Sequence, residues 1–545
     1  MLTIEAQLKK ALHDALLKMG QEIDEEKIVI ERSKEKAHGD YATNVALQSA
    51  RLFRKAPAII AKEISENIDL DIIEKMEVAG PGFLNFFIKQ DSLSGLIKTV
   101  IEKGDNYGRS NYGKGEKINV EFVSANPTGD LHLGHTRGAA LGDSICRMYS
   151  FVGYDVTREF YVNDAGNQIT NLAKSLFVRY HEAFGDNSLK LPEDGYYGED
   201  VKNIAQIIKD ECGDKYLTWN DETFEYLKKR GTQLELEKLN RDLKMFRVDF
   251  DVFSSELEIR RAGLIEKVLE KMKPYIYEQD NATFLRTTDF SDDKDRVIVK
   301  SDGSYTYLLP DIAYHYDKLS RGFKLLVDCL GADHHGYINR MKSALQMLGY
   351  SPDILEIELI QMVRLFKDGQ EYKMSKRTGN AVTIRELCEE VGTDAVRYYF
   401  VARSASSHLD FDLDLASSTS SENPVYYAQY AHARTCQILE LAKKNELVND
   451  PSCAHLEHQK EIDLMKFLAT FPDIVLDAAL TFTPSKITNY TQKLAQLFHA
   501  FYNECKVIDL ANVQLSQERL ALVNATRITM RNALNLVGVN APNKM

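Results

Sequence analysis

Residues 118–150 read INVEFVSANPTGDLHLGHTRGAALGDSICRMYS, and this stretch decides the fold. The apolar, β-branched run at 118–123 predicts a short buried strand. Proline and glycine in residues 126–129 break that strand. Apolar residues then recur at helical spacing from Leu133 onward, and Asp130 is the predicted N-cap of the helix. The stretch therefore predicts a strand, a loop and a helix in succession.

Two histidines mark the start of the predicted helix. His132 and His135 stand three residues apart, so they share one face of the first turn. That turn offers free backbone N–H groups and the positive end of the helix dipole, which suit a polyphosphate. Gly134 has no side chain, so a flat ring can approach the backbone there. A structural role for both histidines is the alternative, and a zinc site would need a third ligand nearby.

A second motif, KMSKR, occupies residues 373–377. Turn-forming residues flank it at 367–369 and 378–380, so it is expected on a mobile loop. Three cations on a loop are often simply solvated. They can also close on a phosphate chain and neutralise charge as pyrophosphate leaves.

Together, the two motifs resemble the His-Ile-Gly-His and Lys-Met-Ser-Lys-Ser signatures of class I aminoacyl-tRNA synthetases. The sequence departs from those signatures at Leu133, which replaces isoleucine, and at Arg377, which replaces the final serine. Both departures leave unchanged the residues that contact phosphate in the family.

Composition sets the broad class. The chain has 545 residues, enough for three or four domains, and is 44% hydrophobic and 27% charged, as in ordinary globular proteins. No run of about 18 apolar residues predicts a membrane span. The N-terminal stretch is amphipathic and lacks the features of a signal peptide. Seven cysteines without C-x-x-C spacing fit a reducing compartment, so a cytoplasmic protein is expected.

The net charge of −13 argues against a non-specific nucleic-acid binder, because such binding depends on bulk positive charge. We therefore expect no DNA partner. A tRNA held by local basic patches remains compatible with this charge.

The predicted fold class is α/β, with a Rossmann-like parallel sheet and two flanking domains. Residues 1–110 predict an α+β domain, and residues 111–416 alternate strands and helices as a nucleotide-binding sheet does. Residues from about 185 to 285 are more charged and helical, and are interpreted as an insertion with a packing role. Residues 417–545 predict a bundle of amphipathic helices.

Further strands of the sheet are predicted along the central region. They lie at residues 156–162, at 295–299 where the second half begins, at 323–330, and at 357–363 before the lysine loop. In the bundle, a stripe of aromatic residues is interpreted mainly as core, although a few members can stack on unpaired bases. Its members are Tyr426, Tyr427, Tyr430, Phe498, Phe501 and Tyr502.

The resemblance extends along nearly the whole chain. Residues 121–135, 292–315, 331–342, 373–380 and 423–434, taken in order, look like bacterial arginyl-tRNA synthetase. The stretches GDYATNVAL and VAGPGFLNFFI, before residue 90, resemble the N-terminal extension of that family, which contacts the corner of the tRNA. The likeness is weakest in the insertion.

The resemblance implies two chemical steps. The arginine carboxylate attacks the α-phosphorus of ATP, and the terminal tRNA ribose then attacks the acyl carbon of arginyl-adenylate. The catalytic residues would be His132, His135, Lys373 and Lys376. Gly134, Asp333 and Ser375 would join these four in binding ATP. Mg²⁺ would accompany ATP, held largely by water and phosphate, with no tightly bound cofactor and no protein metal site. The family also suggests a monomer.

A guanidinium requires planar, bidentate acceptors. By resemblance, Glu121, Tyr307 and Asp311 would hold the guanidinium of arginine. Asn126, together with His335, would hold the α-amino end. The alternative for Glu121 and Asp311 is pairing with neighbouring lysine or arginine residues.

Two other functions compete with this interpretation. One is a different class I ligase, although a cysteine-specific enzyme is disfavoured because no Cys/His cluster is present. The other is a catalytically silent tRNA-binding paralogue, against which the complete His132, His135, Lys373 and Lys376 set argues.

Overall fold

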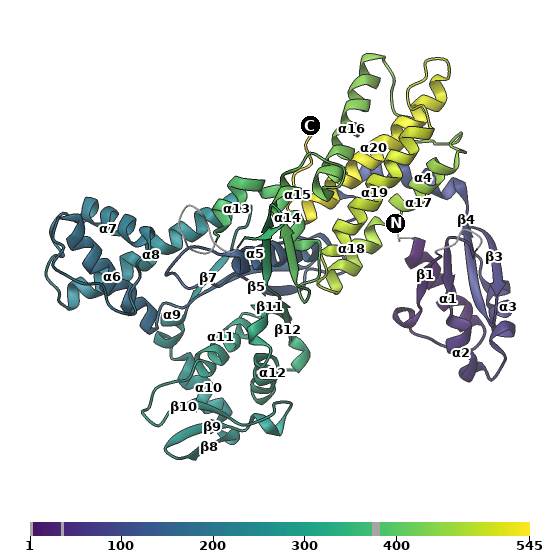
Figure 1. Ribbon diagram of the computed structural model, residues 1–545. Helices are drawn as coiled ribbons and strands as arrows, with labels where there is room; N and C mark the ends of the chain where they lie inside the picture. Colours follow the sequence, from purple (N-terminus) through teal and green to yellow (C-terminus); the bar gives the residue numbers. More distant parts are fainter. Residues whose placement is uncertain (1–3, 34–37, 373–381) are drawn as a thin grey trace.

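A five-stranded parallel sheet forms the centre of the molecule (Figure 1). The computed structural model describes residues 4–33, 38–372 and 382–545. The strand order is β12-β11-β5-β6-β7, and all four neighbouring pairs run parallel. The strands are β5 (Lys117–Glu121), β6 (Asp155–Val162), β7 (Val252–Ser255), β11 (Leu325–Gly331) and β12 (Leu355–Ile360). The chain leaves β5 for β6 on one side and later returns to β11 on the other, so the switch in strand order lies between β5 and β11.

Both faces of the sheet are covered by helices, as parallel strands require. On β11, Val327 packs into the core that contains α5, whereas the adjacent Leu326 packs into the core of α11 and α12. The alternation follows from the two-residue period of a strand. These helices are α5 (Leu133–Phe151), α11 (Leu308–Ser320) and α12 (Tyr337–Met347). The predicted α/β class and Rossmann-like sheet are confirmed.

The region predicted as an insertion is not wholly outside the sheet. Helices α6 (Asn167–Ala183), α7 (Glu199–Cys212) and α8 (Asp221–Met245) build a separate small core at one end of the molecule (Figure 1). The strand β7 that follows, however, pairs in parallel with β6. Its four residues, VFSS, carry no strand-like apolar run, which is why the sequence did not reveal it.

Two of the predicted strands belong to smaller sheets. Residues predicted to begin the second half of the central sheet instead form β10 (Arg296–Val299), in an antiparallel sheet with β8 (Ile276–Gln279) and β9 (Ala282–Leu285). The last predicted strand divides after Ile360, because β13 (Val363–Lys367) pairs with β14 (Gln370–Glu371) and β15 (Leu409–Asp412). Periodicity locates strands but does not reveal their partners. The short helices near these sheets are α9 (Glu256–Arg261), α10 (Leu264–Met272), α13 (Ile384–Val391), α14 (Thr393–Val401) and α15 (Leu413–Ser417).

The N-terminal residues form a distinct α+β unit with its own core (Figure 1). Its antiparallel sheet has the order β1-β2-β4-β3. The elements are α1 (Ile4–Lys18), β1 (Ile30–Arg32), β2 (Tyr41–Thr43), α2 (Val45–Phe53), α3 (Pro57–Asn67), β3 (Ile73–Ala79) and β4 (Phe83–Ile88). Side chains connect the unit to the bundle through Arg32 with Asp473 at 3.4 Å and Lys466 with Asp40 at 2.5 Å.

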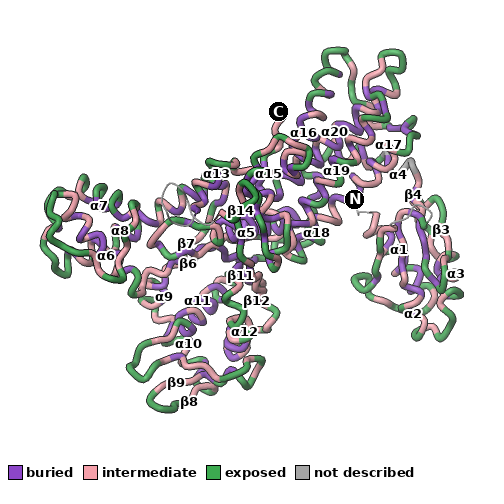
Figure 2. Tube along the Cα trace, viewed as in Figure 1, coloured by how far each residue is buried: buried purple, intermediate pink, exposed green. Residues whose placement is uncertain are grey.

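The C-terminal helices form a bundle that shares one hydrophobic core with the central sheet. Figure 2 shows the buried segments continuing from the sheet into these helices. The helix α4 (Gln90–Lys103), inside the predicted N-terminal domain of residues 1–110, packs on this bundle. A segment predicted as one helix divides into two near Pro472, since proline terminates the preceding helix. The helices are α16 (Pro424–Lys444), α17 (Gln459–Leu468), α18 (Phe471–Leu480), α19 (Ser485–Glu504) and α20 (Val513–Leu536).

A buried arginine joins three parts of the chain. Arg397 on α14 donates to the Asp143 carboxylate on α5 at 2.5 Å, to the Phe246 carbonyl at 2.8 Å and to the Val537 carbonyl at 3.0 Å. These contacts connect the sheet, the end of α8 and the end of the bundle. Over the described residues, no helix combines the length and apolar character needed to cross a bilayer.

Candidate active site

A cleft of about 1530 Å³ opens at the carboxyl ends of the central strands. Its walls come from the end of β5, the N-terminus of α5, the loop after β6, the start of α11 and the end of β11. This is the switch point of the strand order, where parallel α/β sheets bind ligands. Glu121, His132, His135, Asp311 and Asp333 all line it.

The two histidines cap the helix that they begin. His132 is the N-cap of α5, and its Nδ1 accepts a hydrogen bond from the Gly134 amide at 3.2 Å. The Nδ1 of His135 accepts from the His132 amide at 3.4 Å, and the two rings stack 3.8 Å apart. Because both Nδ1 atoms are acceptors, each neutral ring carries its proton on Nε2 and has one donor to offer.

Asp130, the predicted N-cap, has a different role. Its carboxylate pairs with Lys238 of α8 at 3.1 Å. Histidine competes for the cap because its Nδ1 can accept a backbone N–H as an aspartate oxygen does. Desolvation lowers the pKa of His132, and desolvation together with the adjacent His132 lowers the pKa of His135 to about 4. Both rings are therefore neutral near pH 7.

The backbone turns sharply where β5 enters the cleft. Val123 has φ of 69°, rare for a β-branched residue, and the Ser124 amide donates to the Phe122 carbonyl at 2.9 Å. Such a conformation costs about 1–3 kcal/mol and persists where its surroundings impose it. The Ser124 hydroxyl donates to Glu121 at 2.8 Å and accepts from the Tyr161 amide at 3.0 Å, which fixes the turn.

Glu121 reaches the cleft but is paired behind it. Its carboxylate lies 2.5 Å from the ammonium of Lys318, which is fully buried. Burial raises the pKa of Glu121, although the charge of Lys318 opposes this shift. The lysine pairing considered as the alternative for this residue is therefore present, alongside its position at the cleft wall.

Unlike Glu121, Asp311 is held by a tyrosine and a histidine. Its carboxylate accepts from the Tyr337 hydroxyl at 2.5 Å and lies 3.4 Å from Nδ1 of His315. Among the described residues, no lysine or arginine is paired with it. His315 also contacts Asp328 through Nε2 at 2.8 Å, and Asp328 pairs with Lys318 at 3.0 Å. Asp311 itself lines the cleft.

The other predicted site residues are distributed as follows. Tyr307 immediately precedes α11, lines the cleft and is 90% exposed. Asp333 also lines the cleft, with His334 beside it at 3.7 Å. Asn126 and His335 are exposed and do not line the cleft. Lys373, Ser375 and Lys376 lie outside the described residues.

Glu256 is a cleft carboxylate that the sequence analysis missed. It is buried at the start of α9, where it accepts from the Tyr161 hydroxyl at 3.0 Å and from Arg260 at 2.9 Å. The negative charges of Glu256, Asp311 and Glu121 all raise the pKa of Tyr161, after burial itself. Glu256 is the carboxylate that contacts Tyr161 directly. Glu256 lies far from the motifs in sequence, and the pairing of β7 with β6 brings it to the cleft.

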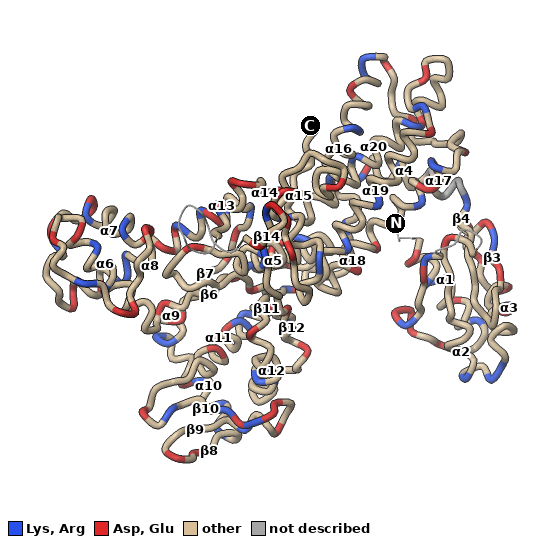
Figure 3. Tube along the Cα trace, viewed as in Figure 1, with Lys and Arg blue, Asp and Glu red and all other residues tan. Residues whose placement is uncertain are grey.

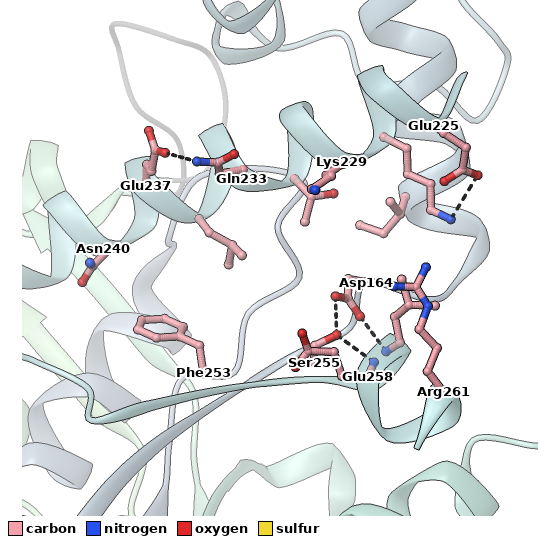
Figure 4. Close-up of a pocket in the computed structure, with 15 residues that line it drawn as sticks. Asp164, Glu225, Lys229, Gln233, Glu237, Asn240, Phe253, Ser255, Glu258 and Arg261 are labelled. Atoms are coloured by element: carbon pink, nitrogen blue, oxygen red, sulfur yellow. Dashed lines mark hydrogen bonds and ion pairs between the residues drawn. The ribbon is translucent and has the colours of Figure 1, made fainter. Parts of the chain in front are cut away.

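Hydrogen bonds fix the corner that carries Glu256 (Figure 4). The Asp164 carboxylate accepts from the Ser255 hydroxyl at 2.6 Å and from the Leu257 amide at 2.9 Å. The Ser255 hydroxyl oxygen also caps α9 through the Glu258 amide at 3.1 Å. Behind this corner, a second pocket of about 660 Å³ lies between α8 and α9. The corner therefore separates that pocket from the cleft.

The segment after the lysine motif is attached to the histidine motif. Thr383 forms an isolated antiparallel bridge with His132, and the Ile384 amide donates to the Leu131 carbonyl at 2.9 Å. Thr383 also caps α13 in a reciprocal capping box with Glu386. The start of α13, which follows the lysine motif in sequence, is thus adjacent to the histidine motif in the fold.

Comparison with known families divides the chain into three matching regions. Residues 3–88 match the arginyl tRNA synthetase N terminal domain. Residues 97–405 match the catalytic domain of class I (R) tRNA synthetases, and residues 428–545 match the DALR anticodon binding domain.

Whole-chain relatives agree with these regions. An arginine–tRNA ligase of Bacillus subtilis is 53% identical over 99% of this chain and 98% of its own length. One of Geobacillus kaustophilus is 51% identical over 99% of both chains. A solved structure described as a putative arginyl-tRNA synthetase from Campylobacter jejuni is 35% identical, with a TM-score of 0.78 over 84% of this chain and all of its own. The Thermus thermophilus arginyl-tRNA synthetase, 22% identical, shares the fold with a TM-score of 0.78 over 99% of this chain and all of its own. The resemblance seen in the sequence motifs is confirmed, and the chain belongs to the arginyl-tRNA synthetase family.

Proposed function

We propose that the chain is an arginine–tRNA ligase that activates L-arginine with ATP and transfers it to the 3′ end of tRNA(Arg), releasing AMP and pyrophosphate. Full-length identity above 50% to arginine–tRNA ligases supports the activity. The observation that carries the choice of amino acid is Asp311, a cleft carboxylate without a lysine or arginine partner among the described residues. A cationic side chain of the substrate would supply that partner.

The phosphate end of the cleft is assigned to the histidine motif. The Nε2–H groups of His132 and His135 would donate to the triphosphate, and Gly134 would let the adenine ring lie near the backbone. Lys373, Ser375 and Lys376 would approach from the loop that Thr383 attaches to His132. Asp333 would contact the nucleotide from the end of β11. ATP would enter as its Mg²⁺ complex, with the ion held mainly by phosphate and water.

The reaction needs positioning and charge stabilisation rather than a covalent enzyme intermediate. The arginine carboxylate attacks the α-phosphorus, and negative charge develops on the departing pyrophosphate. Neutral histidine donors and the two lysines stabilise that charge more strongly in the transition state than in the ground state. The ribose hydroxyl of the terminal nucleotide then displaces AMP from the acyl carbon.

At the other end of the cleft, Asp311 would bind the guanidinium, with Tyr307 closing over it. Glu121 and Glu256 lie on the same wall, but each already has a cationic partner, in Lys318 and Arg260. They would therefore act as additional acceptors beside the main charge of Asp311. Asn126 and His335 remain proposed for the α-amino end, which requires the exposed loops that carry them to approach the bound substrate.

The tRNA would contact the bundle and the N-terminal unit as well as the cleft. Lys and Arg are interspersed with Asp and Glu along the chain (Figure 3), so the contacts would be local basic positions rather than one basic face. We also propose that the enzyme acts as a monomer in the cytoplasm and has no DNA partner. The odd number of cysteines, none of which forms a disulfide among the described residues, fits such a reducing compartment.

The deciding experiment is aminoacylation of total tRNA with each of the twenty amino acids. Charging by arginine alone is the expected result. Charging by a different amino acid would assign the cleft to another class I ligase, and charging by none would favour a silent tRNA-binding protein.

A further inference from the structure

Five charged side chains form a continuous chain beneath the cleft. In order they are Glu121, Lys318, Asp328, His315 and Asp311, with successive contacts of 2.5, 3.0, 2.8 and 3.4 Å. They come from β5, β11 and α11, so the chain runs across the switch point of the sheet. Carboxylates and cations alternate along it.

The chain is most exposed at its Asp311 end. The side chain of Asp311 is 32% exposed and that of Glu121 is 9% exposed, whereas Lys318, Asp328 and His315 are at most 2% exposed. Burying so many charges is costly unless each is paired. The interior charges therefore compensate one another. The negative charge that remains uncompensated lies at Asp311, the exposed end of the chain.

Both nitrogens of His315 face acceptors. Nδ1 lies 2.9 Å from the Asp311 carbonyl and 3.4 Å from its carboxylate, and Nε2 lies 2.8 Å from Asp328. A neutral ring could donate only once, so this geometry favours the imidazolium. Burial would lower the pKa of His315, but the charge of Asp328 and the hydrogen bonds to Asp311 and Asp328 outweigh it and raise the pKa to about 10.

The pairing of these five side chains gives the net charge of the chain. Three carboxylates face two cations, Lys318 and His315, which leaves one negative charge uncompensated at the exposed end. The neighbouring elements add Glu256 with its partner Arg260, together with the hydroxyls of Tyr161 and Tyr337. Those groups, and the nearby Glu159 and Asp317 that share Arg321, leave the net charge negative, so the pocket matches a cationic ligand.

We propose that His315 is a positioning residue for arginine: its imidazolium, anchored by Asp328, holds the Asp311 carboxylate in the orientation that receives the guanidinium. This proposal rests on the proposed function. His315 would not touch the substrate. It would act through Asp311, whose second oxygen is held by Tyr337, so both carboxylate oxygens are fixed before the substrate arrives.

The test is His315→Gln, which keeps hydrogen-bonding capacity but removes the charge. We expect the KM for arginine to rise about ten-fold or more while the KM for ATP stays within about two-fold. Selectivity for arginine over citrulline, its uncharged analogue, should fall by a similar factor in competition assays. A residue needed only for packing would not change these two quantities selectively.

His181→Gln is the matched control. His181 also contacts a carboxylate, Asp186 at 2.9 Å, and a backbone carbonyl, Leu217 at 2.9 Å, but it lies on α6, outside the cleft-lining residues. That variant should keep the arginine KM of the wild type. A folded His315→Gln enzyme with unchanged arginine KM and citrulline selectivity would overturn the proposal.

If the single variant does not fold, the double variant His315→Gln, Asp328→Asn replaces the buried charge pair with a neutral amide pair. The arginine KM of the folded double variant should remain raised, and a wild-type value would refute the positioning role. Failure of the proposed function is distinguishable, because then the wild-type enzyme itself would not charge tRNA with arginine.

Discussion

Thr383 and His132 are joined by an isolated antiparallel bridge, so the chain that leaves the lysine motif is attached to the residue that begins the histidine motif. Thr383 also caps α13, so one residue fixes both the helix and the end of the loop. Any displacement of this cap would move the start of α13 relative to the phosphate site.

Replacing Thr383 with alanine should therefore affect catalysis as well as stability. Loss of the cap should cost about 1 kcal/mol of unfolding free energy. The bridge to His132 is made by backbone groups and remains possible in this variant, but a frayed start of α13 would hold it less firmly, so the turnover number should fall more than the stability loss explains. Asn220→Ala removes a comparable cap from α8 and is the control. Equal turnover in the two variants would exclude a catalytic role for the Thr383 cap.

His132→Ala and Lys376→Ala test the phosphate site. Both groups are proposed to act on charge that develops in the transition state, so turnover should fall about 10²–10³-fold with little change in arginine affinity. Single-turnover rates and equilibrium arginine binding separate the two quantities. A variant with normal turnover would remove that residue from the site.

Asp311→Asn preserves the shape of the side chain and removes its charge. Losing a charge-assisted pair with the guanidinium should cost about 2–4 kcal/mol in arginine discrimination. Asp317→Asn is the control, because Asp317 lies on the same helix and pairs with Arg321 at 3.1 Å instead of facing the cleft. Unaffected arginine binding in Asp311→Asn would place the guanidinium elsewhere.

The low pKa of His135 predicts a specific pH response. The ring should stay neutral until the pH approaches about 4, whereas in the unfolded chain it titrates near 6.5. The unfolded state then binds the extra proton between these values, so this residue makes the protein less stable as the pH falls from 6.5 through about 4. Ring chemical shifts of His135 should not titrate between pH 6 and 8. A midpoint near 6.5 would contradict the desolvated environment.

Coupling to tRNA is the fifth property to test. By family resemblance, we expect arginine-dependent exchange between ATP and pyrophosphate to be near background without tRNA and to appear when tRNA(Arg) is added. Deletion of the bundle after about residue 417 is not a clean test, because the bundle shares a core with the sheet and its removal would expose that core. Surface substitutions on the bundle, such as Arg434→Glu, test the coupling without this damage. Robust exchange by the tRNA-free enzyme would refute it.

Four strands of the central sheet and the helix that follows the first of them could be predicted from the sequence, because these depend on local signals. The run at 118–123 and the helix from Leu133 have clear periodicity, and the histidine motif has a recognisable pattern. The helix cap was assigned to Asp130 rather than His132, since cap preferences rank aspartate highly and do not consider a histidine Nδ1.

Long-range pairing accounts for most of what the sequence did not reveal. Strand β7 has only four residues, and its place beside β6 depends on the Asp164 and Ser255 contacts at the corner. Without β7, nothing in the sequence brings Glu256 to the cleft. The partner of Glu121 was likewise invisible, because Lys318 reaches it only once α11 packs on the sheet. His315, by contrast, lies four residues after Asp311 on the same helix, so their contact follows from helical spacing.

The core common to sheet and bundle has a consequence for synthesis of the chain on the ribosome. The N-terminal unit closes its own core by Ile88, so it can fold while the rest is still being made. The catalytic sheet can complete its contacts only later, because Arg397 donates a hydrogen bond to the carbonyl of Val537, which is synthesised long after the sheet. A chain released early from the ribosome would therefore have a folded N-terminal unit and an incomplete core beneath the active site. Such a chain would be a substrate for chaperones and proteases.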